Sequence, residues 1–200
     1  MSTSEAWKNM REVCIVGVGL HKFGRFPEKG VGDTGREAIL AALEDAGAEF
    51  KDIEAGFLGR VFNIVGTGEH VFGEVGRTGI LIDDVEKACA SSSTAVRIAT
   101  WVIGAGLYDV CLCAGVEKMQ RGIIGAVADE SMAGYAQLLG MGVMPAEYAL
   151  MANRHMAEYG TTPEMFARVG MKNHNNGSLN PYAQYQYTVT LEDVLNSRMI

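Results

Sequence analysis

The sequence predicts an α/β fold with a mostly parallel sheet, because short apolar runs alternate with helix-like segments along the chain. Two of these runs, residues 13–18 (VCIVGV) and 109–115 (DVCLCAG), are typical of buried strands. The chain also has 25 glycines and only 4 prolines in 200 residues. This balance favours tight turns between strands and helices over a proline-rich linker.

The composition limits the class of protein. Hydrophobic residues make up 48% and charged residues 20%, as in ordinary soluble globular proteins. The formal net charge is −7 and the cations are scattered, so we do not expect nucleic acid as a partner. No apolar run reaches the length of a membrane span, and residues 1–9 lack the apolar core of a signal peptide. We therefore expect a cytoplasmic protein, not bound to a membrane, with four reduced thiols.

The first half of the chain alternates strands and helices. After the strand at 13–18, Asp33 or Thr34 is expected to cap a helix that Gly47 ends. A second strand is expected within residues 53–65. Residues 91–107 (SSSTAVRIATWVIGAGL) are apolar on all faces and predict a buried helix, with the serines as N-cap acceptors. The strand at 109–115 then places Cys111 and Cys113 on one face.

The second half is less regular. Residues 116–145 are rich in glycine and methionine and predict a long loop insertion. A helix is expected over 146–159, and Thr162-Pro163-Glu164 opens another. Residues 173–181 are turn-rich, and Thr190 begins a last short helix. We divide the chain into an α/β half at 1–120 and a loop domain at 121–200, and we expect a chain that is incomplete at 200.

Cys89 is the candidate nucleophile. It stands just before the predicted helix at 91–107, and a helix N-terminus offers unpaired N–H groups and partial positive charge. That environment stabilises a thiolate and can bind an oxyanion. The alternative is a free cysteine that packs as a small apolar residue. The other three cysteines lie in apolar runs and are expected in the core: Cys14, Cys111 and Cys113. Cysteine and histidine spacings fit no metal site.

Several segments together resemble one family. Residues 85–93 (VEKACASSS) resemble the nucleophile segment of thiolases, and residues 114–120 (AGVEKMQ) resemble their following strand end, usually GG-x-E-x-M-S. Residues 17–25 (GVGLHKFGR) and 155–162 (HMAEYGTT) are similar to the sterol-carrier-protein type of thiolase, also called SCPx-type or lipid-transfer type. The resemblance spans nearly all 200 residues in order, and corresponds to the N-terminal half of that family.

The resemblance implies a layered α/β/α/β/α fold built from two βαβαβαββ halves, with this chain as the first half plus part of the loop domain. It implies an acyltransferase that cleaves a 3-ketoacyl-CoA thiolytically, or runs the reverse Claisen condensation, through an acyl-S-Cys89 intermediate. Coenzyme A is then a co-substrate, and no cofactor is bound tightly. An aromatic substrate such as benzoylsuccinyl-CoA is compatible with this branch, as are fatty and steroid side-chain substrates.

By motif, the resemblance assigns Cys89 as the nucleophile and Met141, in a Met-Gly pair, as an acyl-pocket residue. The chain departs from the family in lacking a GHP motif and any cysteine after Cys113, so it carries one catalytic residue of several. The serines after Ala90 stand where glycine is common, which narrows the site.

The resemblance also implies partners: acyl-CoA and CoA, a homodimer or tetramer, and a small zinc-binding OB-fold protein that shapes the CoA site. Two alternatives stay open. One is a decarboxylating ketoacyl synthase on the same fold, which also uses a cysteine. The other is a non-catalytic thiolase-like subunit that a partner chain completes.

Overall fold

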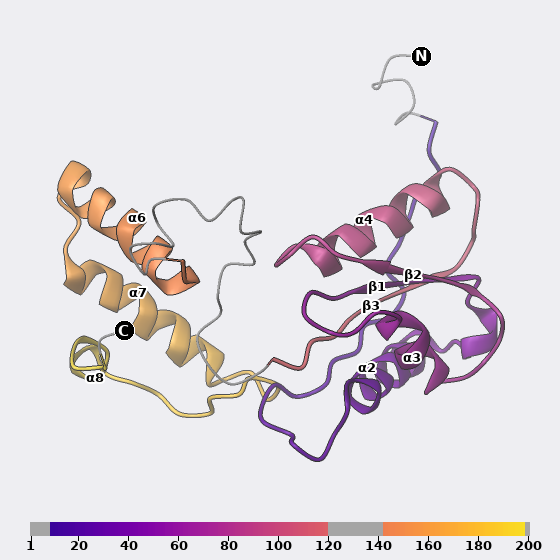
Figure 1. Cartoon of the computed structure of the whole chain (residues 1–200), viewed down its shortest axis with the longest axis horizontal. Helices are drawn as coiled ribbons and strands as arrows, with labels where there is room; N and C mark the ends of the chain where they lie inside the picture. Colours follow the sequence, from indigo (N-terminus) through magenta and orange to yellow (C-terminus); the bar gives the residue numbers. More distant parts are fainter. Residues whose placement is uncertain (1–8, 120–141, 199–200) are drawn as a thin grey trace. The chain divides into compact units, whose positions relative to one another are not determined.

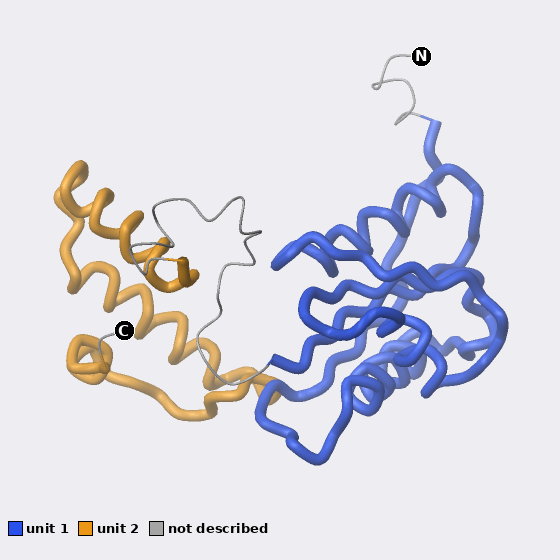
Figure 2. Tube along the Cα trace, in the orientation of Figure 1, with its two compact units in different colours: residues 1–119 blue, residues 120–200 orange. Residues whose placement is uncertain are grey.

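A computed structural model describes residues 9–119 and 142–198 of the chain. The chain divides into two compact units, residues 1–119 and 120–200, which are coloured separately in Figure 2. Each unit is described by itself below. The assignment of the two parts as a nucleophile-bearing half at 1–120 and a loop domain at 121–200 stays a prediction.

Unit 1 is built around a parallel three-stranded sheet with the order β2-β1-β3. The pairing register runs from Ala55 opposite Leu81 and Cys111 to Gly59 opposite Val85 and Gly115. The predicted α/β class with a parallel sheet is therefore confirmed. The elements in chain order are α2 (Val31–Ala46), a 3-10 turn (Phe50–Asp52), β1 (Ala55–Gly59), α3 (Thr67–Gly73), β2 (Leu81–Val85), α4 (Ser91–Gly104) and β3 (Cys111–Gly115).

Helices cover both faces of this sheet, α4 on one side and α2 with α3 on the other (Figure 1). Every residue of the central strand β1 is buried. Its side chains alternate between the two layers: Phe57 packs with Ala95 and Ala99 of α4, whereas Leu58 packs with the α2 and α3 side chains. Unit 1 thus has the α/β/α layering that places strand ends and helix starts at a common edge.

Two predictions about helices need correction: where α2 begins, and how fully α4 is buried. Helix α2 begins at Val31, because Gly30 is the N-cap and the Asp33 carboxylate accepts the Gly30 N–H from inside the first turn. Its predicted end at Gly47 is confirmed, with φ at 63°. Helix α4 was expected to be buried on all faces, but only one face packs on the sheet: Val96 is 44% exposed in the described chain.

The predicted buried strand at residues 13–18 is wrong. These residues form no strand among the described residues, and Ile15 and Val16 are more than 70% exposed. A strand forms only when a neighbour accepts its backbone hydrogen bonds, and here the Val18 N–H bonds to the Asp45 carboxylate instead. Gly17 lies against the backbone of α2 so closely that a β-carbon would overlap the Ala42 carbonyl oxygen.

Within residues 142–198, unit 2 contains α6 (Met144–Tyr159), α7 (Pro163–Gly177) and α8 (Leu191–Leu195). The predicted helix end at Gly160, the start of α7 after Thr162 and the start of α8 after Thr190 are confirmed. The turn-rich prediction for 173–181 is wrong at its beginning, because α7 continues to Gly177. Within 9–119 and 142–198, no helix is long and apolar enough to cross a bilayer.

Candidate active site

Cys89 lies in the short connection between β2 and α4, at the edge where the parallel strands end. Its side chain is exposed. In open parallel sheets this edge is where ligands bind, because the loops that leave the strands gather there. The position agrees with the arrangement expected for Cys89 from the sequence, although its catalytic role stays a prediction.

The turn that carries Cys89 is tight and strained. Ala88 has φ at 46°, a left-handed conformation that costs a residue with a β-carbon about 1–2 kcal/mol. A backbone bridge joins Lys87 to Cys89, and the Ala90 N–H donates to the Lys87 carbonyl at 3.0 Å. Such strain persists only where the surrounding structure holds it, and it is concentrated at functional sites.

Ser91 is the side chain that holds this turn. It is 3% exposed, and its hydroxyl accepts the Lys87 N–H at 2.8 Å. The same hydroxyl donates to the Ala88 carbonyl at 2.8 Å. The prediction that the serines cap the helix is wrong, because the N-cap residue is Ala90 and its side chain makes no capping hydrogen bond. The serine hydroxyls bond backwards instead, and Ser93 donates to the Ala90 carbonyl at 3.0 Å.

This arrangement leaves donors at the start of α4. Among the described residues, the N–H groups of Ser92 and Ser93 have no acceptor. They lie three and four residues after Cys89, in the first turn of a 14-residue helix. Unpaired N–H groups with the positive end of the helix dipole stabilise a nearby thiolate or an oxyanion. The first turn of α4 therefore offers backbone donors that an anionic group could use.

Two glycines let α4 sit directly on the sheet edge. Gly59 and Gly115 are paired in register, at the last positions of β1 and β3. A β-carbon on Gly59 would lie 2.5 Å from the Ser92 nitrogen, and one on Gly115 would overlap the Ser92 hydroxyl. Sequence reasoning missed this platform and the role of Ser91. In the sequence Gly59 and Gly115 are visible only as small residues, because the residue that each of them contacts lies far away along the chain.

The remaining cysteines lie in different surroundings. Burial raises the pKa of the Cys111 thiol to about 11, with a further contribution from Glu54. Burial likewise raises the pKa of Cys113 to about 11, with Cys111 as the second cause. Both pack on the same side of the sheet, against α4, as their spacing predicted. Cys14 was expected in the core, but it is exposed.

Other predicted features are not assembled at this site. Met141 lies outside the described residues, so its role as an acyl-pocket residue stays a prediction. Within the described ranges, no three histidine, cysteine or acidic side chains are grouped as metal ligands would be. Within the described residues, the turn around Cys89 thus provides a thiol and, at the start of α4, backbone donors.

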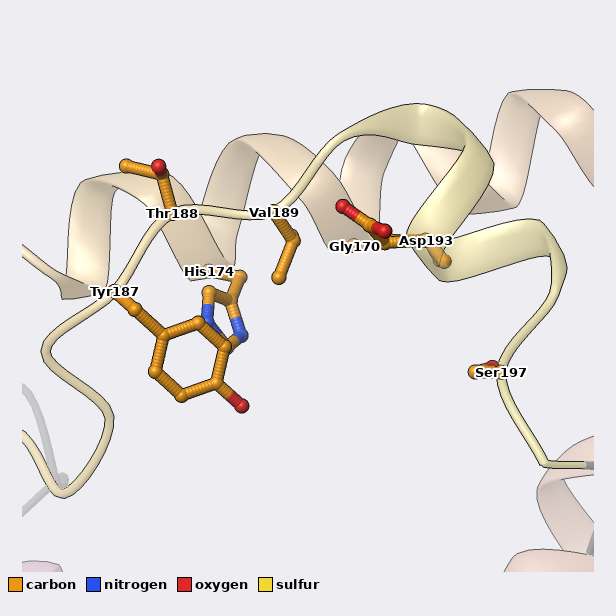
Figure 3. Close-up of a pocket in the computed structure, with 8 residues that line it drawn as sticks. Gly170, His174, Tyr187, Thr188, Val189, Asp193 and Ser197 are labelled. Atoms are coloured by element: carbon orange, nitrogen blue, oxygen red, sulfur yellow. The ribbon is translucent and has the colours of Figure 1, made fainter.

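A separate groove of about 670 Å³ lies within unit 2 (Figure 3). It is lined by α7, α8 and the segment between them, and the His174 ring lies 4.9 Å from the Tyr187 ring. The Asp193 carboxylate in this groove is already engaged by the backbone N–H and hydroxyl of Thr190, which lower its pKa. The groove contains no cysteine, and we assign it no catalytic part.

The fold and site therefore define an α/β protein with an exposed cysteine at the N-terminus of a helix. Comparison with known families is more specific, because the family described as thiolase, N-terminal domain, matches residues 13–192. The chain belongs to the thiolase family.

Individual relatives agree with this assignment. The chain is 39% identical to an acetyl-CoA acetyltransferase of Methanothermobacter thermautotrophicus, over 96% of this chain and 51% of that protein. It is 34% identical to sterol carrier protein 2 of Gallus gallus, over 95% of this chain and 37% of that protein. The chain spans about half or less of the length of these relatives.

Among solved structures, the chain resembles one named Ltp2-ChsH2(DUF35) aldolase, with a TM-score of 0.78 and 28% identity. The match covers 93% of this chain and 49% of that one. An acetyl-CoA acetyltransferase from Syntrophomonas wolfei shares the fold, with a TM-score of 0.66 at 19% identity. The predicted thiolase N-terminal half fold is confirmed by these likenesses.

Proposed function

We propose that this chain carries the nucleophile of a thiolase-type acyltransferase and that Cys89 forms an acyl-thioester intermediate. The observation that carries the proposal is the exposed thiol of Cys89 in the turn before α4, where the Ser92 and Ser93 N–H groups have no acceptor among the described residues. The names of the acetyl-CoA acetyltransferase relatives support the reaction class.

In this mechanism the Cys89 thiolate attacks the keto carbon of a 3-ketoacyl-CoA, and the carbonyl electrons move to oxygen. The oxyanion is positioned to accept hydrogen bonds at the start of α4. When the carbonyl reforms, the bond between C2 and C3 breaks and its electron pair leaves with the shorter acyl-CoA as an enolate, which takes up a proton. The thiol of free CoA, after losing its proton, attacks the acyl-S-Cys89 carbonyl and releases the thiolate.

The structure also gives a reason for the small residues at this site. Gly59 and Gly115 bring Ser92 onto the sheet edge, and Ala90 and Ser91 follow Cys89 without bulk. The acyl group and the direction of the reaction are not distinguished by these residues. The aromatic substrates expected from the sequence, the homo-oligomeric state and the cytoplasmic location remain part of the proposal.

The test is to mix the protein with acetoacetyl-CoA and locate the acyl group by peptide mass spectrometry. The expected result is one acetyl group on the Cys89 peptide, absent in Cys89→Ser. Cys14→Ser is the matched control, because Cys14 is also exposed. The Cys14→Ser variant should be acetylated at Cys89, like the wild type. Acetyl-CoA production that continues undiminished in Cys89→Ser would contradict the proposal.

A second candidate is an aldolase, which the likeness to the Ltp2-ChsH2(DUF35) aldolase favours. An aldol cleavage breaks the corresponding carbon–carbon bond of a 3-hydroxyacyl thioester and forms no acyl-cysteine. Cleavage of a 3-hydroxyacyl-CoA that persists in Cys89→Ser, without acylation of the wild type, would select this candidate. The same neighbour supports a DUF35 protein as a partner. The small zinc-binding OB-fold partner expected from the sequence stays part of the proposal. Co-purification tests that association.

A further inference from the structure

Glu117 links the segment that follows β3 to the segment that follows β1. It follows β3 by two residues, and its Oε2 atom accepts the N–H of Val61 at 2.8 Å and of Phe62 at 3.0 Å. Those two residues lie in the segment that leaves β1 at the same edge of the sheet. Hydrogen bonds to a charged acceptor are shorter and stronger than those between neutral groups.

These two bonds extend the β1–β3 pairing beyond its last register pair. The Val116 N–H donates to the Gly59 carbonyl at 3.2 Å, and the Asn63 side-chain amide donates to the Val116 carbonyl at 3.0 Å. With the Glu117 bonds, they join the two segments that follow Gly59 and Gly115 in the chain. Ser92 lies against these two glycines. The distance between the glycines therefore determines where the first turn of α4 packs on the sheet.

The same segment is tied on its other side to β2. The Arg60 N–H donates to the Val85 carbonyl at 3.1 Å, and Arg60 Nε pairs with Asp84 at 3.0 Å. Val85 is the last residue of β2 and comes four residues before Cys89. The loop after β1 is therefore held between the strand that leads to Cys89 and the strand that leads to Glu117.

We propose that Glu117 is a positioning residue for the Cys89 site, acting through residues 61–63 and the Gly59–Gly115 pair to hold Ser92 and the Cys89 turn. This proposal rests on the thiolase-type function proposed above. Glu117 touches no reacting atom in this role. Its other oxygen, Oε1, is shielded from solvent and has no partner within the described part of the chain. Oε2 alone therefore accepts both N–H groups, and we call this pair of hydrogen bonds the clamp.

Because one acceptor oxygen suffices, Glu117→Gln should keep the clamp and Glu117→Ala should lose it. The chain offers a matched control at the opposite end of the sheet. There Glu54 Oε2 accepts the N–H groups of Asp109 at 2.5 Å and Val110 at 3.3 Å. Glu54→Ala removes a clamp of the same kind from β3, but far along the strand from the edge that carries Cys89.

The experiment measures two rates on the wild type and these three variants. The first is single-turnover acylation of Cys89 by acetoacetyl-CoA, with its dependence on substrate concentration. The second is alkylation of Cys89 by iodoacetamide across pH, which requires no thiolase activity. We expect Glu117→Ala to lower the maximal acylation rate about tenfold, which corresponds to about 1.4 kcal/mol, with the half-saturating concentration unchanged. Glu117→Gln should recover to within about threefold.

Three results would overturn the positioning role. These are a wild-type acylation rate in folded Glu117→Ala, an equal loss in Glu54→Ala, and a Gln variant as slow as the Ala variant. If the wild-type protein is never acylated, the proposed function fails by itself. Positioning is then decided by alkylation, where only Glu117→Ala should change the rate and pH profile of Cys89.

Discussion

Replacing Ser91 with alanine removes the side chain that holds the strained turn before α4. The Ser91 hydroxyl makes two hydrogen bonds of 2.8 Å, one from the Lys87 N–H and one to the Ala88 carbonyl. The Ala88 carbonyl keeps the Ser91 N–H as a donor at 3.1 Å, but the Lys87 N–H is left without an acceptor. The loss falls at a residue that is 3% exposed, where water does not easily replace the hydroxyl.

The magnitude follows from these two bonds. Each neutral hydrogen bond contributes a net 0.5–1.5 kcal/mol, so Ser91→Ala should lower the free energy of unfolding by about 2 kcal/mol. The left-handed Ala88 costs about 1–2 kcal/mol and then loses one of its restraints, the Ser91 hydroxyl, so the turn should relax. We expect the alkylation rate of Cys89 by iodoacetamide to change about tenfold, in step with the loss of the turn geometry.

Urea unfolding followed by circular dichroism measures the stability, and alkylation at fixed pH measures the site. Ser93→Ala is the matched control, since the exposed Ser93 hydroxyl donates only to the Ala90 carbonyl of its own helix start. It should stay within about 0.5 kcal/mol of the wild type. A Ser91→Ala protein with wild-type stability and wild-type Cys89 reactivity would refute the reasoning.

Two further predictions concern the same sheet edge. Gly115→Ala should displace Ser92, lower stability by about 1–3 kcal/mol and slow acylation of Cys89, as measured by urea unfolding and peptide mass. Cys111 and Cys113 should stay unmodified by iodoacetamide at pH 8, because their pKa values are raised to about 11 and the thiol persists. The folded chain then holds protons that the unfolded chain releases above pH 9, so the free energy of unfolding should fall between pH 9 and pH 11.

Each of these has its own contrary outcome. For Gly115, the control is Gly73→Ala at the end of α3, where a β-carbon meets no atom within 4 Å and the change should be neutral or slightly stabilising. Equal effects of the two substitutions would show that Ser92 is not seated on Gly115. For the thiols, labelling of Cys111 or Cys113 at pH 8 as fast as Cys89 would contradict the assigned burial.

Local sequence patterns predicted the features of the fold that neighbouring residues determine. The helix end at Gly47, the start of α7 after Thr162 and the start of α8 after Thr190 depend on residues within one turn. Strand β2 was missed because two of its five residues, LIDDV, are aspartates and only Val85 is buried. Helix α3 was missed because it has only seven residues and carries little periodic signal.

The nucleophile candidate also had a local signal, since small residues around Cys89 precede an apolar helix. Its supporting residues had none. Gly59 and Gly115 matter through a contact with Ser92, and Glu117 matters through the N–H groups of Val61 and Phe62. Such contacts join residues more than 20 positions apart, so no window of sequence contains both partners.

The sequence by itself determined the α/β class, the order of most elements and the placement of Cys89 before a helix, because these follow from composition, periodicity and neighbouring residues. Only the tertiary structure decided which apolar runs become strands. The run at 109–115 pairs with β1 and forms β3, whereas the equally apolar run at 13–18 pairs with no strand in the described part of the chain. The physical reason is that a strand is stabilised by hydrogen bonds to another strand, and which strand lies alongside is a property of the whole fold.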